Sequence, residues 1–114
     1  MGYVAAFIDV TEQSCVVIGG DELAERRVGM LLGAGAKVTV IARALNETLS
    51  GMVARGLIDY RERNYEIGDL EGFRIAYWTD PNNKLARRAA AEARERGVAL
   101  NVSPAHAPRN SRAT

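Results

Sequence analysis

The chain has 114 residues, of which 47% are hydrophobic and 25% charged, and its formal net charge is +1. This length suits one domain with one ordinary core, and so small a net charge gives no strong attraction for nucleic acid or an anionic lipid surface. No apolar run approaches the roughly 20 residues of a membrane helix, and the lone Cys15 fits a buried strand residue of a reducing compartment, so we expect a cytoplasmic protein.

Short apolar runs alternate with longer segments of helical period, which is the pattern of β-α-β units. The first helix is expected to bury a stripe near Leu23, Met30 and Leu31, and Glu92 with Arg96 forms a pair on a solvated helix face. Strands are predicted over 15–18, 37–41, 58–61, 75–78 and 99–102, with a possible edge strand over 7–10, and helices over 22–32, 46–55 and 82–96.

Right-handed crossovers place such helices on both faces of a parallel sheet. The predicted fold is therefore α/β, a Rossmann-like doubly wound parallel sheet in a single domain. We expect this domain to span residues 1–102. Residues 103–114 lose the apolar pattern and are expected to form a flexible tail.

The first predicted strand runs into a glycine turn and a helix, and a second strand follows within about thirty residues. In the G-x-G-x-x-G/A turn of dinucleotide sites, Gly19 and Ala24 fill the first and last places, but Asp21 fills the middle one. A carboxylate there opposes the pyrophosphate, and Asp21 equally suits a helix cap. The turn therefore predicts a site for NAD or NADP, with helix capping by Asp21 as an alternative or an addition.

Arg43 follows the second predicted strand, where NAD sites often carry an acidic residue that binds the ribose. An arginine can accommodate the 2′-phosphate of NADP, so NADP is admissible. We hypothesise that Arg43 contacts the adenosine end of the cofactor. A solvated surface arginine is the alternative.

Three stretches carry a family pattern, namely FIDVTEQSCVVIGGDELAERRVGMLLGAGAKVTVIA, YEIGDLEGFRIAYWTD and ARERGVALNV. In this order and spacing they resemble the precorrin-2 dehydrogenase domain of siroheme synthases, from about residue 7 to residue 102. The family typically runs an apolar strand, then G-G-G, A-x-R-K and L-L-x-x-G-A-x-V-T-V. The resemblance implies NAD-dependent oxidation of precorrin-2 to sirohydrochlorin, sometimes coupled to iron insertion.

By position, the resemblance implies that the turn and the first helical residues lie under the pyrophosphate. It places Arg43 and Ala44 near the adenosine ribose, and Thr79 and Asp80 beside the nicotinamide. No metal ligands are expected. The expected cofactor-binding set is Gly19, Gly20, Asp21, Glu22, Leu23, Arg43, Ala44, Thr79, Asp80 and Asn101.

The chain departs from the family at three places. Asp21 replaces the third turn glycine, and Arg27 replaces the lysine of A-x-R-K. The family's N-V-V-D, with its candidate catalytic aspartate, reads here as Asn-Val-Ser-Pro up to Pro104. The catalytic residue is therefore unknown, and His106 is the one titratable candidate for proton exchange in the tail near neutral pH.

Two functions of different class remain open. The first is an NAD-dependent oxidoreductase with a tetrapyrrole substrate, and the alternative is a non-catalytic dinucleotide-binding sensor or scaffold that has lost the aspartate. A nucleotide-binding regulator of a transport system ranks third, because GGDELAERR and the later Thr-Asp fit the dehydrogenase pattern better. The chain stops where the family continues into a helical region, and a homodimer is a possible partner arrangement.

Overall fold

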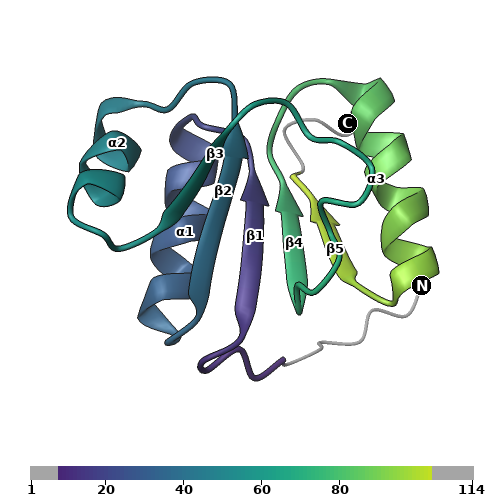
Figure 1. Cartoon of the computed structure of the whole chain (residues 1–114), viewed down its shortest axis with the longest axis horizontal. Coiled ribbons are helices and arrows are strands. Elements are labelled where there is room, and N and C mark those ends of the chain that lie inside the picture. The colour runs from purple at the N-terminus through teal and green to yellow at the C-terminus, as the bar shows by residue number, and fades with distance from the viewer. Residues whose placement is uncertain (1–7, 104–114) are drawn as a thin grey trace, which may run out of the picture.

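A five-stranded parallel sheet forms the centre of the structure, a computed structural model that describes residues 8–103 (Figure 1). The strands follow the spatial order β3-β2-β1-β4-β5, so the predicted Rossmann-like fold is confirmed. All eight predicted central elements form, with ends within one residue of those expected. They are β1 Ser14–Ile18, α1 Glu22–Gly33, β2 Lys37–Ala42, α2 Glu47–Ala54, β3 Asp59–Glu62, β4 Ile75–Trp78, α3 Asn83–Arg96 and β5 Ala99–Val102.

Strand β1 lies in the middle of the sheet and is buried on both faces. Cys15 and Val17 pack into the cluster that includes α1 and α2, whereas Val16 and Ile18 pack into the cluster that includes α3. The continuous apolar run CVVI is explained by this position, because a strand covered on both sides has no solvated face. The two clusters form the core on either side of the sheet.

The predicted edge strand over 7–10 is wrong for the residues that the structure describes. Residues 8–10 are not part of the sheet, and Phe7 lies outside the described residues. The chain turns just before β1, where the Gln13 N–H donates to the Val10 carbonyl at 2.9 Å and Glu12 adopts a φ of 63°. Because of this turn, residues 8–10 run past the end of β1 and do not pair with it. The Val10 side chain is buried in the core.

Each helix begins at a polar side chain that accepts a backbone N–H. Asp21 caps α1, Asn46 caps α2 as predicted, and Asn82 caps α3. The buried face of α1 differs from the one expected, since Ala24, Val28 and Leu31 are buried and Met30 is 46% exposed. The buried stripe of α1 is therefore Ala24, Val28 and Leu31, which face the sheet at helical spacing.

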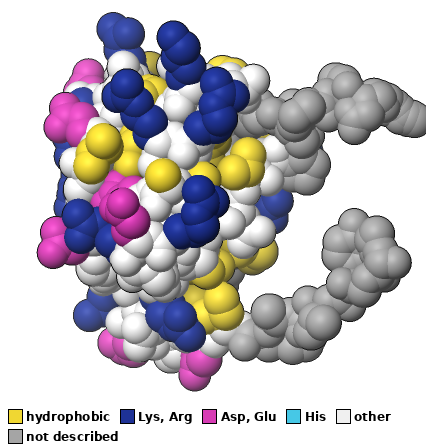
Figure 2. Space-filling view, turned by 90° about the vertical axis from the view of Figure 1, so that its right-hand side faces the viewer, with side chains coloured by type: hydrophobic (Ala, Val, Ile, Leu, Met, Phe, Trp, Pro, Cys, Tyr) yellow, Lys and Arg dark blue, Asp and Glu magenta, His cyan; other side chains and the backbone are white. Residues whose placement is uncertain are grey.

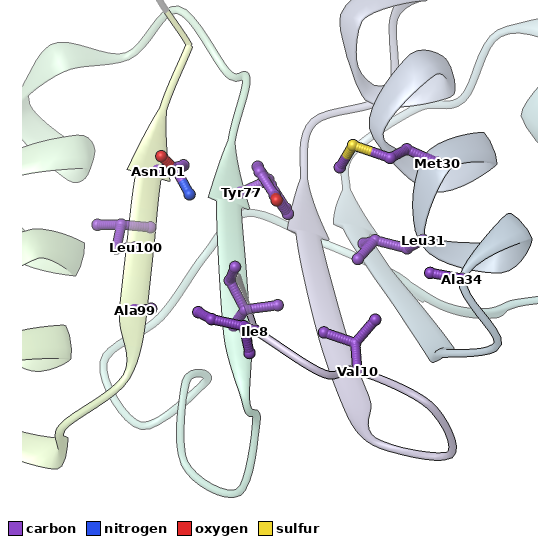
Figure 3. A pocket seen from close by; sticks show the side chains of 10 residues that line it. Ile8, Val10, Met30, Leu31, Ala34, Tyr77, Ala99, Leu100 and Asn101 are labelled. Carbon is purple, nitrogen blue, oxygen red and sulfur yellow. The ribbon is translucent and has the colours of Figure 1, made fainter. Parts of the chain in front are cut away.

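The side of β4 and β5 that adjoins α1 carries no helix among the described residues. A trough of about 660 Å³ lies there, and Figure 3 shows Ile8, Tyr77 and Asn101 over its sheet side and Met30 at the α1 side. Its walls are largely apolar. It lies away from the turn that follows β1.

The opposite face of β4 and β5 is covered by α3, whose outer surface is rich in basic side chains. Lys84, Arg87 and Arg88 are exposed there, and Figure 2, which looks onto this side of the molecule, shows basic side chains prominent among acidic and hydrophobic ones. No described helix is long and apolar enough to cross a membrane.

The segment 63–74, which connects β3 to β4, has no helix and is anchored by Glu92 of α3. Glu92 is only 4% exposed and accepts hydrogen bonds from the Tyr65 hydroxyl, from the Gly68 N–H at 3.0 Å and from the Arg96 Nε at 2.7 Å. The Glu92–Arg96 pair forms, but the prediction that it lies on a solvated face is wrong, because tertiary contacts bury the carboxylate. These hydrogen bonds hold the irregular segment against α3.

We predict that Glu92→Gln lowers the free energy of unfolding by about 2–4 kcal/mol. The substitution removes the negative charge that the surrounding donors stabilise, and it replaces one acceptor oxygen with an amide nitrogen that cannot accept a hydrogen bond. Urea unfolding followed by circular dichroism measures the change. Glu95→Gln, an exposed substitution on the same helix, is the control and is expected to change it by less than about 0.5 kcal/mol. Equal effects of the two variants would show that Glu92 is not an anchor.

The same carboxylate predicts a pH dependence of stability. Burial alone raises the pKa of Glu92, but hydrogen bonds from Tyr65, from backbone amides and from Arg96 outweigh it and lower the pKa below its ordinary value of 4.5. The stabilisation is therefore complete above pH 4.5 and is lost as the pH falls through the folded-state pKa. As the pH is lowered from neutral to acidic, the urea concentration at the midpoint of unfolding should fall less steeply for Glu92→Gln than for the wild type.

Candidate functional site

Two loops meet at the carboxyl ends of β1 and β4, where the direction of strand order reverses. Open α/β sheets bind ligands at this switch point. Together with the loop after β2, these loops enclose a hollow of about 390 Å³, which we call the glycine cradle. Its lining residues are Gly19, Gly20, Asp21, Ala44, Leu45, Asn46, Thr79, Asp80 and Pro81.

The two glycines allow the three loops to come close together. Gly19 adopts a φ of +137°, and a Cβ there would overlap the Thr79 Oγ1. A Cβ on Gly20 would overlap the carbonyl oxygen of Ala44, and the Gly20 carbonyl itself accepts the Asn46 N–H at 2.8 Å. Both positions therefore require glycine for close packing of the loops.

Backbone amides at the start of α1 are available to a ligand. The Gly19 N–H donates to the Ile41 carbonyl at 3.0 Å, and the Ala24 N–H donates to the Asp21 carboxylate at 3.3 Å. In the part of the chain that the structure describes, the amides of residues 20–23 donate to no protein acceptor. Such free donors at a helix N-terminus attract an anion.

The side chains of the cradle are acidic rather than basic. Asp21 caps α1, and the Asp80 carboxylate accepts the Asn82 N–H at 2.8 Å. No lysine or arginine is among the lining residues. A bound diphosphate would therefore rely on amides and on the helix dipole, against the repulsion of nearby carboxylates.

Trp78 and Thr79 fix the loop after β4. The Trp78 indole N–H donates to the Asp80 carbonyl at 2.7 Å, and the Thr79 hydroxyl donates to the Ile18 carbonyl at 3.1 Å. Trp78 is also packed edge-on against Tyr65, with ring centroids 5.5 Å apart. The far wall of the cradle is thus joined to the buried core.

A second hollow of about 230 Å³, which we call the outer hollow, adjoins the cradle and shares Ala44 and Leu45 with it. Its remaining lining residues come from the ends of β2 and β3 and from α2. They are Arg43, Ser50, Tyr60 and Glu62. The two hollows together form a path from the switch point toward the outer strands β2 and β3.

The predicted site residues fall into four groups. Gly19, Gly20, Asp21, Ala44, Thr79 and Asp80 line the cradle, and Arg43 with Ala44 lines the outer hollow. Glu22 and Leu23 form the first turn of α1, and the Glu22 side chain pairs with exposed Arg26 at 3.5 Å. Asn101 lies apart from the cradle, on the wall of the apolar trough (Figure 3).

The sequence interpretation missed Leu45 of both hollows, Asn46 and Pro81 of the cradle, and Ser50, Tyr60 and Glu62 of the outer hollow. Tyr60 and Glu62 reach the outer hollow through the pairing of β3 with β2, which periodicity does not reveal. His106 lies outside the described residues. Within residues 8–103, no group of three or more His, Cys, Asp or Glu side chains could hold a metal ion.

Comparison with known proteins identifies relatives of this architecture. Residues 6–111 match the family model NAD_binding_7, whose description is "Putative NAD(P)-binding". The chain is 36% identical to a siroheme synthase of Methylococcus capsulatus and 32% identical to one of Chromobacterium violaceum, each over 102 residues. Each match covers 90% of this chain and 22% of the relative, so the chain spans about a fifth of the length of these curated relatives.

A solved structure shares the fold. The chain superposes on "SirC, precorrin-2 dehydrogenase" with a TM-score of 0.78 and 19% sequence identity, covering 96% of this chain and 54% of that one. At this identity the likeness concerns the fold alone.

We predict that Gly19→Ala lowers the free energy of unfolding by about 1–3 kcal/mol from backbone strain alone, because its φ of +137° disfavours any side chain. The overlap with Thr79 adds to this loss. Gly29→Ala is the matched control: it lies within α1 with open space around it, and it should stabilise the protein by about 0.5–1 kcal/mol. Opposite signs in urea unfolding support the requirement for glycine at position 19, and the same sign would refute it.

Proposed function

Because the chain belongs to the NAD(P)-binding family that its residues 6–111 match, we propose that it holds NAD for the oxidation of precorrin-2 to sirohydrochlorin. The likeness of this domain to siroheme synthases supports the same assignment. This activity is a proposal for the chain, which covers 22% of those relatives.

The observation that carries the proposal is the row of free amides at residues 20–23, beside a hollow at the switch point of the sheet. The helix α1 points its N-terminus at this hollow, and 390 Å³ leaves room for a diphosphate. These residues fit a dinucleotide, although Asp21 occupies the middle glycine position of the turn and Asp80 adds a second carboxylate.

We assign the diphosphate to the amides of residues 20–23. Arg43 and Ala44 would lie beside the adenosine ribose, since they line the adjoining outer hollow. Thr79 and Asp80 would border the nicotinamide side, on the opposite wall of the cradle. The Trp78 hydrogen bond to the Asp80 carbonyl keeps that wall in place.

When bound, NAD would supply the hydride acceptor, so that the oxidation would remove one hydride and one proton from precorrin-2. The protein's own part is to orient the dinucleotide at the end of β4. Proton acceptance has no assigned residue, because Pro104 stands where the family carries its aspartate.

The position of Pro104 and the carboxylate of Asp21 favour one second function, a dinucleotide-binding domain without turnover. Isothermal titration calorimetry with NAD tests the part that both functions share. Adding precorrin-2 and following the absorbance of reduced nicotinamide then separates them. Binding with turnover supports the dehydrogenase, binding alone supports the second function, and absence of binding contradicts both.

We predict that Asp21→Asn tightens NAD binding about two- to fivefold, because it removes a like charge at the helix N-terminus while an asparagine still caps α1. Calorimetry measures the change in Kd. Asp59→Asn is the matched control: the same substitution at the start of β3 is exposed, lies at the opposite end of the sheet and should leave Kd unchanged. Unchanged or weaker binding by Asp21→Asn would refute a diphosphate beside this carboxylate.

A further inference from the structure

The outer hollow has one positive and one negative side chain on its walls. Arg43 follows β2, and Glu62 ends β3. Both are exposed, and in the described part of the chain neither forms an ion pair. A ligand that enters the hollow therefore meets both charges directly.

The pairing of β2 with β3 explains how a carboxylate reaches this place. Ala42 is opposite Glu62 in the parallel register, so the last residues of the two strands lie side by side. The β2 position at which NAD sites often carry an acidic residue is here occupied by Arg43. Glu62 supplies a carboxylate from the neighbouring strand instead.

Tyr60 lines the same hollow and lies close to the Glu62 carboxylate. Its hydroxyl donates to the Ala42 carbonyl at 2.9 Å, which fixes the ring under the end of β2. Burial and the negative charge of Glu62 raise the pKa of Tyr60, as expected when the carboxylate lies close to the phenol. Tyr60 and Glu62 thus form one continuous surface.

We propose that Glu62 is the specificity-determining residue for the cofactor: it accepts a hydrogen bond from the adenosine ribose of NAD and repels the 2′-phosphate of NADP. This inference rests on the proposed function, because it takes the cradle as the diphosphate site and the adjoining hollow as the adenosine site. It assigns a role to a residue that the glycine-turn pattern does not include.

The charges of the two walls act in opposite directions on a 2′-phosphate. Arg43 attracts it, whereas Glu62 repels it and leaves a ribose hydroxyl as the better partner. Arg43 alone would make NADP admissible. With Glu62 in the same hollow, the site favours the cofactor that brings no third phosphate.

The test compares the affinities for NAD and NADP of the wild type, Glu62→Gln and Arg43→Gln by calorimetry. Wild type is expected to bind NAD more tightly than NADP. Glu62→Gln should lower the ratio of the NADP Kd to the NAD Kd by about tenfold or more, the effect of one hydrogen bond to a charged group. Arg43→Gln should raise that ratio, because it weakens the binding of NADP.

Glu95→Gln removes one negative charge from the exposed surface of α3 and is expected to leave the ratio unchanged. Urea unfolding confirms that each variant is folded. A ratio unaltered in Glu62→Gln, with NAD still bound, overturns the role of Glu62 and leaves the proposed function standing. A wild-type preference for NADP also overturns it, and a failure of both cofactors to bind overturns the proposed function as well.

Discussion

The close approach of three loops at the carboxyl edge of the sheet is the constraint on which the site depends. Gly19 packs against Thr79, and Gly20 packs against the carbonyl of Ala44, with no room for a Cβ at either contact. This brings the ends of β1, β2 and β4 together around one hollow. It also leaves the amides of residues 20–23 as donors, because the chain enters α1 there without a backbone partner.

The charge of the cradle opposes an anionic ligand. Asp21 and Asp80 line it, and no lysine or arginine is among the lining residues. The same Asp21 carboxylate stabilises α1 by capping it, so one side chain favours the fold while it opposes an anionic ligand. In our proposal, selectivity is set further out, where Arg43 and Glu62 line the outer hollow.

The sequence predicts the order and position of the central elements because each has a strong local signal. Apolar runs mark the strands, and Asn46 or Gly97 mark helix ends through capping and a left-handed φ of 70°. The glycine turn predicts the cradle for the same reason. The fold class and the NAD(P)-binding character follow from these signals, whereas the family follows from the resemblance of three longer stretches; all agree with the family match.

Residues that act through tertiary contacts could not be predicted in this way. Glu92 has the sequence pattern of a solvated helical pair, and only the irregular segment 63–74 packed over it makes it a buried anchor. Glu62 reaches the outer hollow through the register of β2 with β3. Asn101, expected beside the cofactor, lies in the apolar trough because of the strand face to which it belongs.

The most direct test of the central claim is a crystal structure of the chain grown with NAD. We expect diphosphate oxygens within about 3 Å of the amide nitrogens of residues 20–23, at the N-terminus of α1. An empty cradle with the Asp21 carboxylate turned across it, or a dinucleotide bound in the apolar trough, would contradict the assignment.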